Sequence, residues 1–563
     1  MFHRLWRKWK RRAKHSKAVN PDEIFLDSSN LPAFDKDQFE GRIETPIAKR
    51  YLSGLLMLFV AIVSVFLARA VYLEGVQGGI YATRAARNSL KKEIIFAHRG
   101  LITDRNDISL SWNEESTSTP FAKRAYTKSP GFSNILGFVK YPGEDSSGNL
   151  YSFYTAGQDG VEKYFDARLR GENGAKLTEV SVKGEIESQG TLEPAQAGEK
   201  LMLSLDSRVQ EALYNQISDA ALKSGFKAGA GVIMDARTGE VLASVSYPGY
   251  DENVMTAGSD KEAIEQFLTS EKEPFLDRAS AGLYAPGSIV KPFVAAGVLQ
   301  EKIINPEKQI FTVGYISLPN PYDPDNPSIF KDWKDHGYVD MKRALAVSSD
   351  AYFYIVGGGF GAQKGLGINK IDEYMKKFLF GEPTLGFFAG PAGTIPTPEW
   401  KEATFNGDDW RIGDTYHTAI GQYGFQVTPL QIARAMSGIA NEGVIVSPTI
   451  LKNEQGGKTD VSGVEKKYYK IIKEGMRLAV TNETAIALNI PGVEVAAKTG
   501  TAQIGANNDR VNSWVEGFFP YENPRFVFAL VLENGPTTYA VSSMRAMADA
   551  LSWMRDNTPE YVE

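Results

Sequence analysis

An uncharged run of 18 residues, Tyr51–Ala68, constrains the fold of this 563-residue chain more than any other feature. A helical rise of about 1.5 Å per residue gives the run a length of roughly 27 Å, close to the thickness of a bilayer core. Arg69 follows the run, and the next residues, through Leu73, are again apolar. We therefore expect residues 51–73 to form one transmembrane anchor.

The residues before this run are basic. Residues 1–19 hold eight Lys or Arg and no acidic residue. Cytoplasmic flanks of membrane helices are enriched in Lys and Arg, so we expect residues 1–50 to form a cytoplasmic tail. The protein is then a single-pass protein of the cytoplasmic (inner) membrane, with its N-terminus inside and the bulk of the chain outside the cytoplasm.

This N-terminal region has two other interpretations. A basic tail could bind nucleic acid, but these charges precede an apolar run, as in a membrane flank, and we expect no nucleic-acid partner. A cleaved signal peptide could end near Ala68 and Ala70. However, fifty residues before the apolar run are too many for the n-region of a signal peptide. The sequence therefore favours an uncleaved anchor.

A hydroxyl group and an amine lie three residues apart at Ser288 and Lys291. The next segment, Phe293–Gln300, is apolar and rich in Ala, which predicts a buried helix. Residues three apart share one helix face, so the amine of Lys291 is expected to lie beside the hydroxyl of Ser288. A serine needs an adjacent base to act as a nucleophile, and a lysine can be that base.

The composition argues against other kinds of nucleophilic site. The chain has no Cys, only five His and no G-x-S-x-G sequence, so a thiol nucleophile and a strand-turn-helix serine elbow both lack a candidate. Taken alone, S-x-x-K remains a weak signal, because a helix start followed by a solvated Lys gives the same spacing. Two later motifs strengthen the catalytic interpretation.

The first later motif is Ser348-Ser349-Asp350, which opens an apolar run, and the second is Lys498-Thr499-Gly500-Thr501, which precedes a strand-like run. S-x-x-K, then S-x-N or S-x-D, then K-T-G, in this order, is the signature of penicillin-binding proteins and serine β-lactamases. The chain resembles a class B penicillin-binding protein, a monofunctional peptidoglycan transpeptidase.

Two further elements extend the resemblance toward the N-terminus. Residues 99–106 match the R-G-x-I-x-D-R-N element of the family, and residues 160–171 match its G-x-E-x-x-Y-D-x-x-L-x-G element, with Phe165 inserted into the spacing. The resemblance implies a non-enzymatic, dimerisation-like pedestal over residues 74–200, which contacts partner proteins. Residues 201–563 would form the penicillin-binding transpeptidase domain.

The residue patterns of this second region agree with an α+β domain. Asp206 is placed to cap a helix, and Gly229–Ser246 has the pattern of a β-hairpin. Helices are expected to dominate from Ser288 to about Phe380, and a final helix is expected over residues 542–554. The resemblance implies an antiparallel sheet flanked by helices, as in serine β-lactamases. The whole chain is thus expected to combine one transmembrane helix, a mixed α/β pedestal and this domain.

The resemblance also implies a two-step acyl transfer. Ser288 would attack the carbonyl between the two terminal D-Ala residues of a peptidoglycan stem peptide, and Lys291 would take its proton. After D-Ala leaves, an amine on a neighbouring stem attacks the acyl-enzyme and forms the cross-link. Ser348 would relay a proton between the lysine and the leaving amine. The same serine, Ser288, would be covalently bound by β-lactams.

The K-T-G motif would bind the substrate. Lys498 and Thr499 match the positions that hold the terminal carboxylate, and Lys498 is expected to stay charged for this role. Gly500 and Thr501 complete the substrate-binding set, and the backbone N–H groups of Ser288 and Thr501 would form the oxyanion hole. No cofactor is expected. No metal site is expected either, because His98, His336 and His417 lack zinc-ligand spacing.

Asp350 departs from the family pattern, since most relatives carry Asn at this position. An Asp loses the amide donor and gains a charge that can pair with a nearby lysine. Ser-x-Asp resembles the elongation branch, penicillin-binding protein 2, more than the division branch. We therefore predict a role in cell elongation and cell shape, with a division-type (septal) transpeptidase as the alternative.

Two other functions share the acylation motifs. A β-lactam sensor would need a cytoplasmic effector domain, which fifty residues with few apolar positions cannot build. A β-lactamase would need a deacylating group, and no glutamate can be assigned to that role. For a transpeptidase, the resemblance implies stem peptides of lipid II-derived glycan as substrate. It implies a SEDS-family glycosyltransferase and other elongation-complex proteins as partners.

Overall fold

The computed structural model describes residues 49–143, 145, 151–180, 186–320, 323–461, 463–505, 507 and 509–562. The predicted cytoplasmic tail therefore lies outside the described residues, apart from its last two. Contacts divide the chain into two units, residues 1–89 and residues 90–563. The domain boundaries expected at residues 74 and 200 remain predictions.

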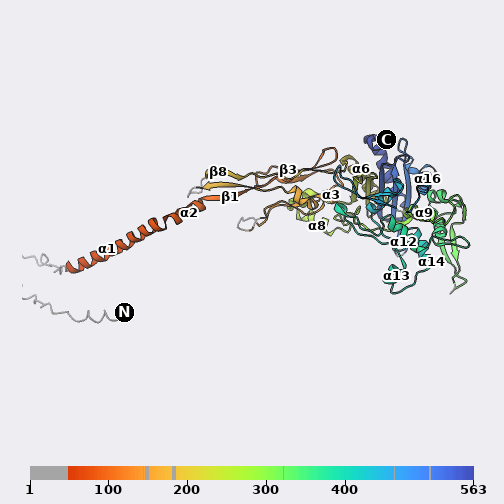
Figure 1. Cartoon of the computed structure of the whole chain (residues 1–563), viewed down its shortest axis with the longest axis horizontal. Helices are drawn as coiled ribbons and strands as arrows, with labels where there is room; N and C mark the ends of the chain where they lie inside the picture. The colour runs from red at the N-terminus through yellow and green to blue at the C-terminus, as the bar shows by residue number, and fades with distance from the viewer. Residues whose placement is uncertain are drawn as a thin grey trace, which may run out of the picture. The chain divides into compact units, whose positions relative to one another are not determined.

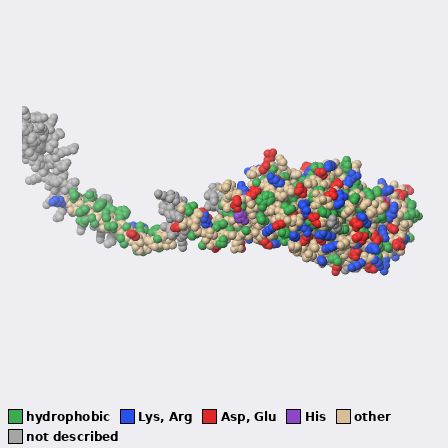
Figure 2. Space-filling model, turned by 90° about the horizontal axis from the view of Figure 1, so that it is seen from above, with side chains coloured by type: hydrophobic (Ala, Val, Ile, Leu, Met, Phe, Trp, Pro, Cys, Tyr) green, Lys and Arg blue, Asp and Glu red, His purple; other side chains and the backbone are tan. Residues whose placement is uncertain are grey.

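The first unit is helical where it is described. It contains α1 (Lys49–Val71), a π-helical turn (Tyr72–Val76) and α2 (Gly78–Ser89). No residue of α1 is buried, and the helical segment Lys49–Val76 is long and apolar enough to cross a membrane. Figure 2 shows hydrophobic side chains covering this segment, whereas Lys, Arg, Asp and Glu are interspersed over the second unit. The predicted anchor, residues 51–73, falls within this helical segment.

The second unit begins with residues 90–200, which we call the pedestal from here on. The pedestal contributes to two small sheets of three and four strands and forms one β5–β6 pair. Its strands are β1 (Leu90–Ile95), β2 (Ile102–Thr103), β3 (Ser109–Glu114), β4 (Lys123–Tyr126), β5 (Val139–Lys140), β6 (Ala156–Gly157), β7 (Gly174–Val180) and β8 (Ile186–Glu193). Its short helices are α3 (Ser133–Leu136), α4 (Gly160–Tyr164) and α5 (Asp166–Leu169). The strand β9 (Leu201–Met202) pairs in parallel with β2, so hydrogen bonding continues across residue 200.

A buried ion cluster explains the two pedestal motifs. The carboxylate of Glu162 accepts hydrogen bonds from Arg99 Nε and, at 2.7 Å, from Arg124 Nε. Arg99 also donates to the Glu162 carbonyl at 2.7 Å and lies 2.8 Å from Asp166. None of the Glu162 surface is exposed, and each of its carboxylate oxygens has a partner. The cluster therefore joins the R-G and G-x-E elements through fully paired charges.

The R-G-x-I-x-D-R-N element also contacts the C-terminal domain, which we define as residues 201–563. Asp104 accepts hydrogen bonds from the N–H and hydroxyl groups of Ser207. Asn106 donates to Asp206 at 2.8 Å. Asp206 is the N-cap of α6 (Ser207–Ser224), as the sequence predicts, and accepts from the N–H of Arg208. The motif thus attaches the pedestal to the first turn of this helix.

An antiparallel sheet of five strands forms the centre of the C-terminal domain, in the order β11-β10-β20-β19-β18. The strands are β10 (Ala228–Asp235), β11 (Val241–Tyr247), β18 (Ala496–Ile504), β19 (Arg510–Phe519) and β20 (Phe526–Pro536). The predicted hairpin is β10–β11, and the predicted final helix is α17 (Ser542–Asn557). Both predictions are confirmed, and Figure 1 shows the C-terminal strands, in blue, near α6, α9 and α16.

Two hydrophobic cores cover the two faces of this sheet. Val515 and Leu530 point into the core that contains α6 and α17, whereas Trp514 and Phe518 point into the opposite core. The opposite core is built largely from α9 (Lys291–Gln300), α11 (Asp350–Gly358) and α15 (Pro429–Ala440). The predicted antiparallel sheet flanked by helices is confirmed.

The remaining elements lie between or after these. The helices are α7 (Glu252–Ala257), α8 (Lys261–Thr269), α10 (Met341–Ala346), α12 (Ile368–Lys377), α13 (Pro398–Thr404), α14 (Ile412–Ala419) and α16 (Lys466–Asn482). The strands are β12 (Ile310–Thr312), β13 (Tyr315–Leu318), β14 (Ser328–Lys331), β15 (Gly337–Val339), β16 (Val444–Val446) and β17 (Lys458–Asp460). β12–β15 interrupt the region that we expected to be dominated by helices. Their short runs of apolar and aromatic residues suit paired strands, and two glycines adopt positive φ: Gly314 between β12 and β13, and Gly337 at the start of β15.

Candidate active site

Ser288 lies in a 3₁₀ turn, Gly287–Val290, directly before α9. Gly287 has φ +59°, and a Cβ atom there would come within 2.6 Å of the Thr501 carbonyl oxygen, so only Gly fits this close approach to β18. Trp514 Nε1 donates to the Ala285 carbonyl at 2.9 Å and holds the chain before the turn. Ser288 is partly exposed, and within the described chain its hydroxyl makes no hydrogen bond.

Lys291 is fully buried at the start of α9, and its amine is directed to the second motif. The amine donates to the Ser348 carbonyl and to Asp350 Oδ1, both at 2.7 Å. The sequence predicts that Asp350 can pair with a nearby lysine, and this is confirmed. Within the described chain the amine makes its hydrogen bonds to Ser348 and Asp350 and none to Ser288. The expected position of the amine beside the Ser288 hydroxyl is therefore not marked by a hydrogen bond.

Ser348 connects all three motifs. Its hydroxyl oxygen lies 2.7 Å from Lys498 Nζ and 3.4 Å from Lys291 Nζ. The residue sits between α10 and α11 with φ +58°, a left-handed conformation that is costly for a side-chain-bearing residue. Backbone strain of this kind is concentrated at functional sites. The structure thus brings Lys291, Ser348, Asp350 and Lys498 into one connected group beside the Ser288 turn.

Lys498 is fully buried on β18, which the sequence did not suggest. Burial, followed by the positive charge of Lys291, holds the pKa of Lys498 well below its usual range, although Glu516 and Asp350 act in the opposite direction. Burial therefore opposes the charged form that the sequence analysis expects for Lys498, and that expectation remains a prediction. The K-T-G pattern identifies the lysine but does not reveal that its amine is buried beside the positive charge of Lys291.

The rest of the K-T-G motif is available to a ligand. Thr499 is partly exposed and Thr501 is exposed. Gly500 allows β18 to approach the serine turn, because a Cβ atom there would come within 2.8 Å of Ile289 Cγ2 and 3.1 Å of the Pro286 carbonyl oxygen. The predicted nucleophile and the predicted substrate-binding strand are therefore directly adjacent.

Asp332 belongs to this site and was missed in the sequence. Its carboxylate accepts hydrogen bonds from Ser349 Oγ at 2.8 Å and from the Ala351 N–H at 2.9 Å, which fixes the first turn of α11. Burial by itself would raise the pKa of this carboxyl group. The nearby His336 Nε2, 3.4 Å away, the hydrogen bonds from Ala351 and Ser349, and the charge of Lys291 outweigh burial and lower the pKa of Asp332 to about 2. The only sequence signal was an Asp four residues before a His.

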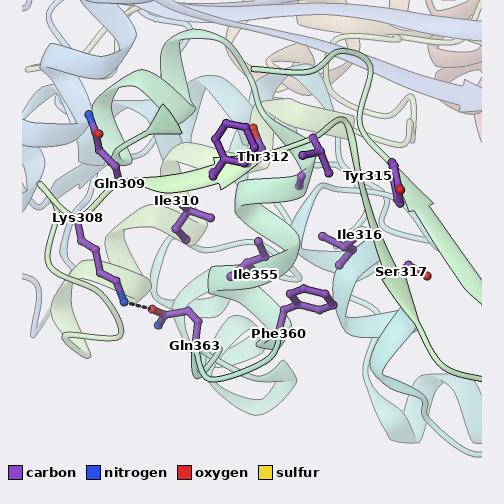
Figure 3. A pocket seen from close by; sticks show the side chains of 13 residues that line it. Lys308, Gln309, Ile310, Thr312, Tyr315, Ile316, Ser317, Ile355, Phe360 and Gln363 are labelled. Atoms are coloured by element: carbon purple, nitrogen blue, oxygen red, sulfur yellow. Dashed lines mark hydrogen bonds between the residues drawn. The ribbon is translucent and has the colours of Figure 1, made fainter. Parts of the chain in front are cut away.

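A separate cavity of about 450 Å³ lies beside α11 (Figure 3). Its lining includes Ile310, Tyr315, Ile355 and Phe360, from β12, β13, α11 and the loop after α11. The eight predicted site residues are absent from this lining as far as the chain is described. The cavity is therefore distinct from the group around Ser348.

Comparison with known proteins identifies the family. Residues 229–551 match the penicillin-binding protein transpeptidase domain, and residues 117–203 match the penicillin-binding protein dimerisation domain. The chain belongs to the penicillin-binding protein transpeptidases. With both domains present it is a class B penicillin-binding protein, so the predicted family and enzyme class are confirmed.

Individual relatives agree with this assignment. The chain is 31% identical over 470 residues to the peptidoglycan D,D-transpeptidase MrdA of Haemophilus influenzae, covering 76% of this chain and 69% of the relative. It is 29% identical over 478 residues to MrdA of Escherichia coli K12, covering 78% and 72%. The crystal structure of Pseudomonas aeruginosa PBP2 in complex with WCK 5153 matches with a TM-score of 0.67 at 28% identity, covering 84% of this chain and all of that one. These relatives confirm the prediction of an elongation-type peptidoglycan D,D-transpeptidase.

Proposed function

We propose that this transpeptidase cross-links peptidoglycan stem peptides through an acyl intermediate on Ser288. The observation that carries the proposal is the position of Ser348 Oγ between Lys291 Nζ and Lys498 Nζ, which joins the three motifs in one site. Ser288 Oγ attacks the carbonyl between the terminal D-Ala residues, and the proton passes to the amine of Lys291. The N–H groups of Ser288 and Thr501 stabilise the oxyanion that forms.

Asp350 supports the proton transfer. Its carboxylate lies 2.7 Å from Lys291 Nζ, so it stabilises the ammonium that exists once the amine has taken the serine proton. The hydroxyl of Ser348 then offers a path for that proton toward the departing D-Ala amine. In the second step the incoming stem amine loses its proton by the same route in reverse, and its nitrogen replaces Ser288 on the acyl carbon.

The terminal carboxylate of the stem peptide is proposed to lie along β18. The exposed side chain of Thr501 and the partly exposed side chain of Thr499 offer hydroxyl donors, and the amine of Lys498 lies behind them. A β-lactam carries a carboxylate in a comparable place and is proposed to acylate Ser288 in the same way. The relative from P. aeruginosa was crystallised in complex with WCK 5153.

We further propose the cellular setting. α1 anchors the chain in the cytoplasmic (inner) membrane with the N-terminus inside, which the basic residues before it support. A Helicobacter pylori PBP2 that matches at 26% identity, with a TM-score of 0.68, is described in complex with MreC. We propose that this chain likewise joins an elongation complex, and that a SEDS-family glycosyltransferase supplies the glycan whose stems it cross-links.

Cross-link formation on lipid II tests the function. The full-length protein in detergent or vesicles is combined with its glycosyltransferase partner. It is expected to form cross-linked muropeptides and to release D-Ala in the same reaction. Ser288→Ala should give uncross-linked glycan only. A fluorescent penicillin adduct should persist for hours on the wild-type protein, whereas rapid release would indicate a β-lactamase. Cross-links formed by Ser288→Ala would contradict the proposal.

A further inference from the structure

Glu516, on β19, is a buried acidic residue without a hydrogen-bond partner. None of its surface is exposed, and within the described part of the chain neither carboxyl oxygen makes a hydrogen bond. Burying a carboxyl group in this way is unfavourable, and native structures contain few such groups. Two other buried acids are bonded: Glu162 to two arginines and Asp206 to Arg208 and Tyr561. Glu516 therefore needs an explanation other than packing.

Strand register places Glu516 opposite Lys498. The two residues are direct partners in the antiparallel β18–β19 pair. Directly opposed residues project from the same face of a sheet, with Cβ atoms about 4.5–5.5 Å apart. This is the face that carries Trp514 and Phe518 into the hydrophobic core. Lys498, equally buried, extends from this position to the hydroxyl of Ser348. The amine of Lys498 and the carboxyl group of Glu516 are thus both buried on the same face of the sheet.

We propose that Glu516 is a positioning residue that supplies Lys498 with its charge when a substrate carboxylate binds. The pair holds one exchangeable proton and has no net charge wherever that proton resides. In the free enzyme the proton is on the Glu516 carboxyl group, and Lys498 is a neutral amine. When the substrate carboxylate approaches, the carboxyl O–H bond breaks and an N–H bond forms on Lys498. This inference rests on the proposed role of β18 in binding the stem carboxylate.

The electrostatics of the site agree with this direction. Burial raises the pKa of Glu516 well above its usual range and lowers the pKa of Lys498, so burial favours the neutral form of each group. The charge of each group opposes the effect of burial on the other. The positive charge of Lys498 lowers the pKa of Glu516, and the negative charge of Glu516 raises the pKa of Lys498. An arriving anion strengthens this coupling, because it favours the charged lysine and therefore the ionised glutamate.

Other charged groups near the pair are accounted for. The charges that act on Lys498 besides Glu516 are Lys291, from α9, and Asp350, from α11. α15 packs against β19, and its Arg434 is bonded to the carbonyls of Leu379, Glu382 and Pro383. α16 packs against β18, and three of its charged side chains have other partners: Lys473 with Glu442, Glu474 with Lys342, and Arg477 with the Val495 carbonyl. α17 packs against the opposite face of the sheet.

The test is the pH dependence of acylation in Glu516→Gln. Gln has nearly the same shape but can neither store the proton nor carry the charge. With the full-length protein and benzylpenicillin, which bears a carboxylate, the wild-type second-order acylation rate should fall at alkaline pH as the Glu516–Lys498 pair loses its exchangeable proton. In Glu516→Gln this fall should begin at a pH lower by about one unit or more. The methyl ester of benzylpenicillin, which lacks the carboxylate, should not show the difference.

Two further variants separate this role from a structural one. Glu516→Asp keeps the carboxyl group and should recover part of the wild-type pH profile. Glu533→Gln removes a carboxylate from the same sheet that is bonded to Arg278 and Tyr284, and it should leave the profile unchanged. An unchanged profile in Glu516→Gln, or an equal shift with the ester, would overturn the inference. Absence of acylation in the wild-type protein would instead refute the proposed function.

Discussion

Glu162 in the pedestal and Glu516 in the C-terminal domain are both carboxyl groups with no exposed surface. Glu162 receives hydrogen bonds from Arg99 and Arg124, and these two charged partners compensate for its burial. Glu516 lies opposite Lys498 on the neighbouring strand, and its carboxyl group is hydrogen-bonded to no described residue. Burial raises the pKa of Glu516. The guanidinium group of an arginine does not lose its proton in a protein, whereas the ammonium group of a lysine can.

This difference separates a structural charge cluster from a reactive one. The pedestal cluster fixes the geometry of two chain elements. The active-site cluster around Ser348 combines two lysines, two carboxyl groups and the strained backbone of Ser348, and we propose that a proton moves within it when a substrate carboxylate binds. Changes to the active-site cluster should therefore alter rates and pH profiles. Changes to the pedestal cluster should alter stability.

The largest expected effect is on the acylation rate of Lys291→Arg. Arginine preserves the positive charge but cannot act as a base, because it does not lose its proton in a protein. The second-order rate of penicillin acylation should fall about 10²–10⁴-fold, to nearly the level of Lys291→Ala. Lys308→Arg, at the cavity beside α11, is the matched control and should acylate like the wild type. A Lys291→Arg variant that acylates at a normal rate would remove Lys291 from the role of base.

The next effect is on stability, in Glu162→Gln. Gln retains the shape but removes the negative charge that pairs with Arg99 and Arg124, so one buried positive charge is no longer compensated. Breaking a buried ion pair from one side costs about 3–5 kcal/mol, so the Tm of the pedestal should fall. The acylation rate of the folded fraction should not change. Glu199→Gln, in an exposed pair with Arg168, is the control and should leave Tm nearly unchanged. An unchanged Tm in Glu162→Gln would contradict the structural role of the Glu162 cluster.

The smallest effect concerns Asp332 and acid. Its pKa is about 2 when folded and 3.8 in an unfolded chain, so its ionised form contributes about 2 kcal/mol to stability at neutral pH. That contribution is complete above pH 4 and is lost as the pH falls toward 2. Asp332→Asn should lower the free energy of unfolding at neutral pH and flatten its dependence on pH in this range. Equal acid sensitivity of the variant and the wild type would show that Asp332 is not the titrating group.

Local patterns predicted much of this architecture. The cap at Asp206, the β10–β11 hairpin and the last helix depend on residues close in sequence, so their patterns sufficed. The motif spacing likewise identified the groups that meet at Ser348. Asp350 was correctly expected to pair with a lysine, because a change from Asn to Asp has a direct electrostatic consequence.

Features that depend on long-range packing were not predictable. The burial of Lys498 follows from the register of three strands and the position of α11, which no local pattern encodes. Glu516 was visible only as one acidic residue in an apolar strand, and its partner is 18 residues away across a turn. Asp332 lies 17 residues before the serine that it binds, with β15 and α10 between them, in a region whose sequence predicted mainly helix.

The most direct test of the account is the site of the penicillin adduct. The full-length protein is labelled with benzylpenicillin, digested and mapped by mass spectrometry. We predict one covalent adduct, on Ser288 in the peptide that contains Pro286 and Lys291, and none in Ser288→Ala that has kept its wild-type Tm. An adduct on Ser348 or on any other residue, or labelling that persists in Ser288→Ala, would contradict the central claim that Ser288 is the nucleophile.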